Sequence, residues 1–419
     1  MGAREKIMKK NIKYLFYSAS GLVVLVLLTF IYKKYFSSNL RIRELPVLHI
    51  NLDKEPEHRW DDVIAHMDIA LISQFDHVAG TFLEPLNNIQ PYIARLAKSP
   101  LIPDEYQREL HGIIQALDKR SDVQTKNITY ENLVLLSLAY DMAVHCLAGI
   151  IVGTSNEPYL FRNFDWHMPS LHKALVYVQW HKQGKLLFTS IGAPFILSIF
   201  TGQRHGAFAL ALNARYSDKR TIQERVETYL KTPVNIWSSG ILARYALEYM
   251  SDYHHAYTLC KSAQLITPVY FALAGTQSDE GVIIARDCAD IAFKDKITQW
   301  QQYYSATGKP VNPYNSRSPI IIDPQHAQNR YIIRANGDST EIMQPQDLKQ
   351  SAPNRCAALY TSAYRRNSAL NSCCTLKSDF SHEDLLYHVL AQPPVRNKCT
   401  LYAAVMSPAR AICNGYGIW

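Results

Sequence analysis

The 419-residue sequence contains no internal repeat and no long low-complexity segment, which excludes a repeat array and points to an ordinary globular chain. It also lacks a basic cluster interleaved with aromatic residues. The formal net charge is only +8, and Lys and Arg are scattered except at the N-terminus. We therefore expect no nucleic acid among its partners. With 47% hydrophobic residues, the chain can bury one large core or two smaller ones.

Cysteine is scarce in the N-terminal part. The first of eight cysteines is Cys146 and the second is Cys260, so the segment before Cys146 contains none. A disulfide between that segment and the rest of the chain is excluded by counting. No group of cysteines has the spacing of a zinc site, and we expect neither a metal nor a cofactor. If Cys146 is catalytic, seven cysteines remain and at least one other lies outside a disulfide; their connectivity does not follow from the sequence.

Residues 1–44 differ from the rest of the chain. A largely uncharged run from Tyr14 to Tyr32 is closed by Lys33-Lys34, and five basic residues precede it: Arg4, Lys6, Lys9, Lys10 and Lys13. A bilayer span needs ~20 apolar residues, and the heavier positive charge before the run favours an N-terminus inside. We predict a single N-terminal transmembrane signal anchor, with a cleaved signal segment as the alternative. The protein would then be membrane-anchored or exported (lysosomal, extracytoplasmic or periplasmic), with the membrane as a partner.

Residues 45–145 are predicted to be mostly helical after one short strand. Alternating apolar residues over Val47–Leu52 are typical of a half-buried strand, and apolar residues then recur at helical spacing. A run that is apolar nearly all round, Leu133 to Val144, predicts a buried helix. This helix is expected to end at His145-Cys146.

From Cys146 onward strands dominate. The predicted strands are Leu147–Val152, Pro158–Phe164, Ala174–Trp180, Lys185–Ile191, Ala207–Leu212, Val269–Ala274, Gly281–Ala285, Tyr331–Arg334 and Cys399–Val405. Helical patterns cover Glu224–Met250, with an interruption at Pro233, and also Tyr253–Gln264 and His382–Leu390. Strands with helices grouped around them indicate an α+β fold of stacked sheets covered by helices. A long polar insertion around residues 286–334 is a surface loop or an active-site cover.

The predicted chemistry centres on Cys146. Two strand-like runs joined by a short turn would bring the end of the second strand back beside the start of the first. A cut between His145 and Cys146 would give Cys146 both a nucleophilic thiol and a basic α-amine. Arg162, near the end of the second run, would favour the thiolate. Asp165 would accept a hydrogen bond from the new ammonium.

Cys146, Arg162 and Asp165, with the string RNFD, resemble the catalytic core of the N-terminal nucleophile amidases. From about Leu45 to Trp419 the chain is similar to the acid ceramidase and N-acylethanolamine-hydrolysing acid amidase family, notably in LPVLHINLDKEPEHRW, LAYDMAVHC, TPVYFALAGTQSDEGVIIARD and NKCTLYAAVMSP. The resemblance implies a four-layer αββα sandwich. It also implies self-cleavage into a small, mostly helical subunit (45–145) and a catalytic subunit (146–419), which stay together as a heterodimer.

The resemblance also implies a substrate and an oxyanion hole. A fatty-acyl amide, such as an N-acylethanolamine or a ceramide, would be hydrolysed through a thioester on Cys146. The amide of Asn336 and a backbone N–H would stabilise the oxyanion. Asn336-Gly337 is also a common turn sequence, so a purely structural role is the alternative.

Two further family strings are matched in part. Asn213 and Arg215 match one string, whose middle Glu is replaced here by Ala214. Because a carboxylate there would help hold the α-amine, this departure puts the orientation of the amine in doubt. Arg365 resembles the first Arg of another string, and a solvated basic pair is the alternative.

Apolar residues near these motifs are candidates for contact with an acyl chain. Trp166, Met168 and Phe195 would line such a pocket, or they would belong to the core. His145 would assist cleavage or cap the preceding helix.

Two other functions stay open. One is an amidase of the same fold, like choloylglycine hydrolases, that acts on another linear amide. The other is an inactive, membrane-anchored lipid-binding homologue, which the departures at Ala214 and around Arg365 favour.

Overall fold

The computed structural model describes residues 42–84, 90–99, 102–138, 145–166, 168–215, 221–231, 236–288, 320–322, 331–335, 362–377 and 379–418. The chain from Arg43 to Ile418 forms one compact unit. Asn336 and most of the predicted insertion lie outside the described residues.

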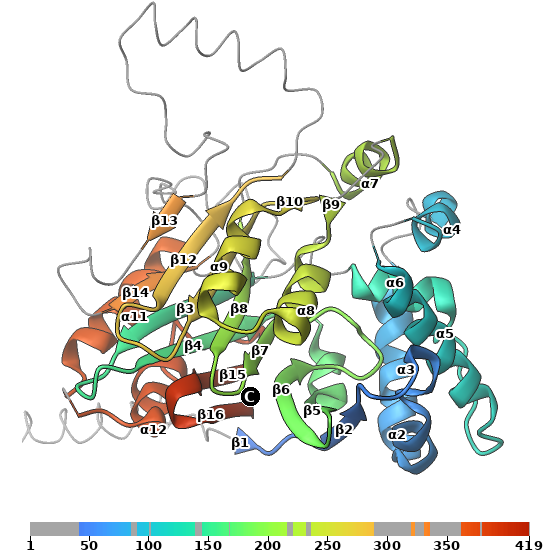
Figure 1. Ribbon diagram of the computed structural model, residues 1–419, viewed down its shortest axis with the longest axis horizontal. Coiled ribbons are helices and arrows are strands. Elements are labelled where there is room, and N and C mark those ends of the chain that lie inside the picture. Colours follow the sequence, from blue (N-terminus) through green and yellow to red (C-terminus); the bar gives the residue numbers. More distant parts are fainter. Residues whose placement is uncertain are drawn as a thin grey trace, which may run out of the picture. The chain divides into compact units, whose positions relative to one another are not determined.

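Two large β-sheets form the centre of the part that is described (Figure 1). The first sheet contains β2 (Val47–Asn51), β5 (Val176–Lys182), β6 (Lys185–Gly192), β7 (Thr201–Arg204), β8 (Phe208–Ala214), β11 (Val269–Ala274), β12 (Gly281–Arg286) and β13 (Ile320–Ile322). Its eight strands lie in the order β13-β12-β11-β8-β7-β6-β5-β2.

The second sheet contains β1 (Ile42–Arg43), β3 (His145–Val152), β4 (Pro158–Asp165), β14 (Tyr331–Arg334), β15 (Thr400–Ser407) and β16 (Ile412–Ile418). Its six strands lie in the order β1-β16-β15-β4-β3-β14. The short strands β9 (Ile236–Trp237) and β10 (Gln264–Leu265) form a separate parallel pair.

Small side chains let the two sheets approach closely. Strand β3 packs against β8, and β11 packs against β3 and β4. The core between them is rich in alanine: Ala148, Ile150, Leu160, Ala209, Ala211, Tyr270, Ala272, Ala274, Ile283, Ala285, Ile332, Met406 and Cys413. A Cβ on Gly415 would lie 2.3 Å from Ile191 of the facing sheet, so this glycine is required by the close approach.

Helices cover the outer face of each sheet. On the eight-stranded sheet, α8 (Ser239–Tyr249) packs on β6, β7 and β8, and α9 (Tyr253–Ser262) packs on β11 and β12. On the six-stranded sheet, α11 (Ser362–Thr375) packs on β14; α12 (His382–Leu385) and η9 (Leu386–Leu390) pack on β15. The prediction of stacked sheets covered by helices is confirmed.

The described residues between β2 and β3 are mostly helical. They form η1 (Pro56–His58), α2 (Asp61–His66), α3 (Ile69–Leu83), α4 (Gln90–Ala97), α5 (Asp104–Asp118) and α6 (Tyr130–Ser137). Thr129 caps α6, because its Oγ1 accepts from the backbone N–H of Asn132 at 3.3 Å. Helix α4 packs on α7 (Ile222–Lys231), and β2 adds to the eight-stranded sheet parallel to β5.

The helix before Cys146 is shorter than predicted. It ends at Ser137, and His145 already belongs to β3. The prediction that a helix runs to His145 is therefore wrong, as is the alternative that His145 caps a helix. The ladder with β4 begins only at His145, and residues 139–144 lie outside the described residues.

The predicted localisation is corrected by the structure. Within the described part of the chain, no helix has both the length and the apolar character needed to cross a bilayer. The prediction of a single N-terminal transmembrane segment is therefore not supported. The run from Tyr14 to Tyr32, at the lower limit of length for a bilayer span, lies outside the described residues.

Candidate active site

The hairpin of β3 and β4 brings the start of β3 and the end of β4 together. Its antiparallel register pairs His145 with Asp165 and Cys146 with Phe164. A short turn closed by a backbone hydrogen bond of 3.0 Å joins the two strands, as the sequence predicts. Cys146 therefore lies one residue from the start of one strand, beside the end of the other.

Arg162 lies against the thiol of Cys146. Its Nη2 donates to Cys146 Sγ at 2.7 Å, and both side chains are 0% exposed. Attraction between a guanidinium and a thiolate is stronger in such an interior than in water. The arrangement therefore favours the nucleophilic form of the sulfur.

A hydroxyl pair and two rings hold this guanidinium. Arg162 Nη1 donates to Thr201 Oγ1 at 2.8 Å and to the carbonyl oxygen of Phe200. Thr201 Oγ1 lies 2.7 Å from the hydroxyl of Tyr402. The guanidinium carbon is 5.0 Å from the ring centroid of Phe164 and 5.9 Å from that of Tyr402, within cation–π range. Burial raises the pKa of Tyr402 to about 12, so this hydroxyl stays protonated near neutral pH.

Both carboxylate oxygens of Asp165 have partners. Thr400 Oγ1 donates to Oδ1 at 2.5 Å, and Arg365 Nη2 donates to Oδ2. The same Arg365 nitrogen donates to the carbonyl oxygen of Val395 at 3.1 Å. Arg365 is only 5% exposed, which disfavours the solvated basic pair. The carboxylate is thus fixed in direction at the end of the ladder where His145 lies.

Sequence reasoning missed three of these residues: Thr201, Thr400 and Tyr402. A signal was present for two of them, because Thr400 and Tyr402 both fall in the string NKCTLYAAVMSP. They stand opposite Asp165 and Phe164 on β15. Thr201 opens β7, whose sequence TGQR reads locally as a turn.

Asn213 and Arg215 lie at the end of β8. Asn213 is buried, and its Nδ2 donates across to the carbonyl oxygen of Arg334 on β14 at 2.9 Å. Arg215 Nη1 pairs with Asp287 Oδ1 at 2.7 Å. Asn336 lies two residues beyond Arg334 and outside the described residues, so its part in an oxyanion hole stays a prediction.

The three apolar candidates are buried. Trp166 lies edge-on to Phe82, with ring centroids 5.7 Å apart, and Phe195 lies edge-on to Phe75 at 5.3 Å. Both contacts are made with helix α3. Met168 belongs to the same hydrophobic core. These contacts describe core packing, and a pocket for an acyl chain stays a prediction.

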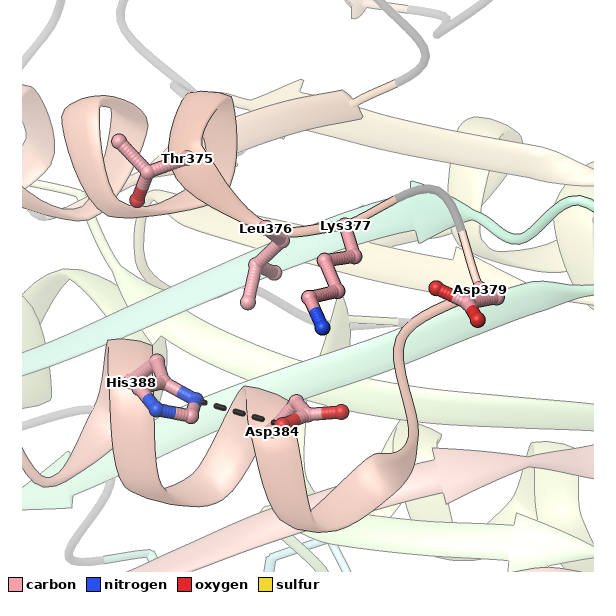
Figure 2. A pocket seen from close by; sticks show the side chains of 6 residues that line it. All are labelled: Thr375, Leu376, Lys377, Asp379, Asp384 and His388. Atoms are coloured by element: carbon pink, nitrogen blue, oxygen red, sulfur yellow. Dashed lines mark ion pairs between the residues drawn. The ribbon is translucent and has the colours of Figure 1, made fainter.

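A pocket of about 510 Å³ lies elsewhere, between the end of α11 and α12 (Figure 2). It is lined by Thr375, Leu376, Lys377, Asp379, Asp384 and His388. His388 Nδ1 lies 3.4 Å from Asp384 Oδ1. None of the predicted site residues lines this pocket, and its charged wall does not suit an acyl chain.

The fold and the cluster together define a class of protein. The stacked sheets lie between helical layers. They carry the thiol of Cys146 near the start of a strand, the guanidinium of Arg162 on its sulfur, and the carboxylate of Asp165 beside His145, the residue before Cys146. This is the arrangement of a cysteine hydrolase of the N-terminal nucleophile type.

Comparison with known proteins gives relatives that are named as amidases and ceramidases. The N-acylethanolamine-hydrolyzing acid amidase of Caenorhabditis elegans is 25% identical over 368 residues, which cover 86% of this chain and 88% of the relative. That of Rattus norvegicus is 27% identical over 378 residues (87% and 86%), and the acid ceramidase of Homo sapiens is 26% identical over 388 residues (89% and 86%). A scan against models of known protein families finds no match.

Among solved structures, the ortholog of the amidase from Caenorhabditis elegans aligns with a TM-score of 0.48 and 21% identity, covering 65% of this chain and 100% of that chain. The sequence similarities to these relatives extend over most of this chain and most of each relative. The chain is a homologue of the acid ceramidase and N-acylethanolamine-hydrolysing acid amidase family, and by class it is a hydrolase acting on amides.

Proposed function

We propose that this protein is a self-cleaving amidase that hydrolyses the linear amide bond of fatty-acyl amides, an N-acylethanolamine or a ceramide, through a thioester on Cys146. The observation that carries the proposal is the 2.7 Å contact between Arg162 Nη2 and Cys146 Sγ. It occurs where the ladder pairs His145 with Asp165. The names of the homologous amidases and ceramidases support the substrate class.

Self-cleavage would begin at the bond before Cys146. The sulfur attacks the carbonyl carbon of His145, the bond from that carbon to the nitrogen of Cys146 breaks, and the thiol proton passes to the nitrogen. Water then hydrolyses the resulting thioester. The products are a carboxylate on His145 and a thiol and α-amine on Cys146, and Asp165 would orient the new ammonium.

Turnover would use the two groups of Cys146 in sequence. The α-amine, with an unperturbed pKa of roughly 7.7–8.0, takes the thiol proton and returns it to the leaving amine of the substrate. The sulfur meanwhile attacks the amide carbonyl and becomes acylated. In the second half the amine takes a proton from water, which attacks the thioester. Arg162 stabilises the thiolate, and Asn336 with a backbone N–H would stabilise the oxyanion.

The frame of the site would survive such a cut. The side chains described above that hold Arg162 and Asp165, and the groups that these side chains bond in turn, all follow position 146 in the chain: Phe200, Thr201, Arg365, Val395, Thr400 and Tyr402. Cleavage between His145 and Cys146 removes none of them. This supports a nucleophile that is assembled before its amine is released.

The burial of Cys146 favours a second candidate as well. At 0% exposure in the intact chain, the thiol fits a nucleophile that becomes accessible only after cleavage. It equally fits an inert thiol in an uncut, lipid-binding homologue. Ala214, at the position of a family Glu, also favours the inactive alternative.

Denaturing electrophoresis with mass spectrometry separates the two candidates. Under acidic, reducing conditions we expect two fragments, the second beginning at Cys146, and we expect Cys146→Ala to stay uncut and inactive. Cys260→Ala is a matched control, since Cys260 is also fully buried and burial raises its pKa to about 12. An uncut wild-type chain that hydrolyses no amide would overturn the proposal.

Parallel assays of an N-acylethanolamine, a ceramide and a conjugated bile salt decide the substrate class. We expect hydrolysis of the fatty-acyl amides. Turnover of the bile salt alone would instead support the choloylglycine-hydrolase-like alternative.

A further inference from the structure

Arg162 contacts the sulfur of Cys146 with one nitrogen and the hydroxyl of Thr201 with another, and Thr201 in turn contacts the hydroxyl of Tyr402. We propose that Thr201 and Tyr402 are positioning residues, which hold Arg162 so that one guanidinium nitrogen stays on the sulfur of Cys146. This inference rests on the proposed function, because it concerns how the same thiol is activated.

The geometry of a guanidinium explains why this contact matters. The group is planar and rigid, so fixing the direction of one terminal nitrogen fixes the other. Arg162 Nη1 is fixed by Thr201 Oγ1 at 2.8 Å and by the carbonyl oxygen of Phe200, and Nη2 then lies 2.7 Å from Cys146 Sγ. If the hydroxyl of Thr201 is removed, Nη1 keeps only one of these two acceptors, the carbonyl oxygen of Phe200.

Tyr402 in turn fixes Thr201. A threonine hydroxyl rotates freely unless its own partners hold it, and the hydroxyl of Tyr402 lies 2.7 Å from Thr201 Oγ1. The ring of Tyr402 is stacked on Phe164, with centroids 5.0 Å apart and planes 14° apart, so packing holds it in place without the hydroxyl. Tyr402→Phe therefore removes the hydrogen bond and keeps the packing.

The chain offers matched variants for a test. Tyr402→Phe removes the hydroxyl of Tyr402, and Thr201→Val removes that of Thr201. Thr201→Ser keeps a hydroxyl at position 201. Tyr177→Phe is the control, because Tyr177 is a partly buried tyrosine whose hydroxyl donates elsewhere, to the carbonyl oxygen of Cys413 at 3.0 Å. Each variant is compared with wild type in melting temperature, in rate of self-cleavage and in kcat and KM for the amide substrate.

The decisive readout is the pH dependence of alkylation of Cys146 by iodoacetamide in the cut enzyme, followed by peptide mass spectrometry. A guanidinium that moves off the sulfur favours the thiolate less, so the midpoint should move to higher pH in Tyr402→Phe and Thr201→Val. We expect kcat to fall roughly 10- to 100-fold, the size of effect that a misplaced group causes, with KM near the wild-type value. Thr201→Ser and Tyr177→Phe should behave as wild type.

Folded variants with the wild-type midpoint and kcat would overturn the inference. If Tyr402→Phe does not fold, the comparison of Thr201→Val with Thr201→Ser decides, since only one of them keeps the hydroxyl. Failure of the proposed function is recognised separately. In that case the wild-type chain itself stays uncut, before any variant is compared, and the inference falls with it.

Discussion

At the scale of single residues, the site depends on a positive charge placed in a dry interior. Arg162 is fully buried, and replacing a buried ionic group by well-packed apolar residues is often neutral or stabilising. Stability alone therefore gives little reason for a guanidinium at this position. Its contact with the sulfur of Cys146 does give a reason, because the charge stabilises a thiolate.

Arg162→Lys should leave most of the chain uncut. A single ammonium cannot reproduce the planar fork that reaches both Cys146 and Thr201. We expect self-cleavage and amide hydrolysis to fall roughly 100-fold or more, as when one electrostatic stabiliser is removed from an active site. Band intensities on denaturing gels over time measure the rate of cleavage.

The control for this change is Arg108→Lys. The side chain of Arg108 is 43% exposed and pairs with Glu55 on the surface, so this variant should cleave as wild type. Normal cleavage by Arg162→Lys as well would contradict the role assigned to the guanidinium.

At the scale of elements, strand register decides where each side chain of the candidate site points. Side chains alternate between the two faces of a strand, so Arg162 and Asp165 on β4 face opposite ways. Arg162 meets Thr201 of the facing sheet, whereas Asp165 meets Arg365 of helix α11. A slip of one residue between β3 and β4 would exchange these faces and dismantle the site.

The 3-10 helix η4 (Pro169–Ala174), just after β4, contains a half-buried histidine that should make the fold sensitive to acid. Burial lowers the pKa of His172 in this element, and it lowers that of His205 in the same way. As pH falls below about 6.5, these imidazoles take up protons in the unfolded chain before they do so in the folded chain. The free energy of unfolding should therefore decrease as pH falls through this range.

Urea denaturation of His172→Gln at pH 7.5, 6.0 and 5.0 measures this effect. We expect the variant to lose less stability on acidification than wild type does. The control is His77→Gln, which replaces an exposed imidazole and should leave the pH dependence unchanged. A variant with the wild-type slope would show that His172 does not contribute.

At the scale of the whole molecule, a buried ion cluster joins the segment before Cys146 to the segment after it. Arg244 of α8 makes a bidentate pair with Glu109 of α5, at 3.0 and 2.5 Å, and its guanidinium carbon lies 4.2 Å from the ring of Tyr106 and 4.5 Å from that of Trp180. Burial opposes the charge, but Glu109 and Glu248 outweigh it and raise the pKa of Arg244.

If the chain is cut as proposed, we expect this cluster to help hold the two fragments together. Cys399 takes part in a disulfide, but no cysteine precedes Cys146, so non-covalent contacts would hold the small fragment: packing, ion pairs and hydrogen bonds such as those of the β2–β5 ladder. Arg244→Met would leave Glu109 with Arg59 as its remaining guanidinium partner, at a cost below the about 3–5 kcal/mol of a buried charge left without any partner. We expect the cut variant to release its small fragment on dilution, as measured by size-exclusion chromatography.

The uncut double variant Cys146→Ala, Arg244→Met is the control for folding, since its segments stay covalently joined. It should remain a single folded species with a lowered melting temperature. Fragments of Arg244→Met that stay associated at the same dilution as wild type would argue against this role of the cluster.

Local pattern predicted some elements fully and missed others. The strands Val269–Ala274 and Tyr331–Arg334 have the predicted bounds, because apolar and β-branched runs favour a buried strand whatever surrounds them. Strand β7, with the sequence TGQR, and helix α11, with SAYRRNSALNSCCT, carry polar patterns and were not predicted. Strand β7 is held by its pairing with β6 and β8, and helix α11 by its packing on β14.

The sequence by itself predicted Cys146, Arg162 and Asp165, together with the hairpin that places Arg162 on the sulfur of Cys146 and Asp165 beside His145, because all of this lies within one short stretch governed by strand pairing. Only the tertiary structure decided which side chains hold these three in place. Thr201, Arg365, Thr400 and Tyr402 come from a separate strand, a helix and the next-to-last strand of the fold. Hydrogen bonds between such distant segments depend on how the layers pack, and no local pattern encodes them.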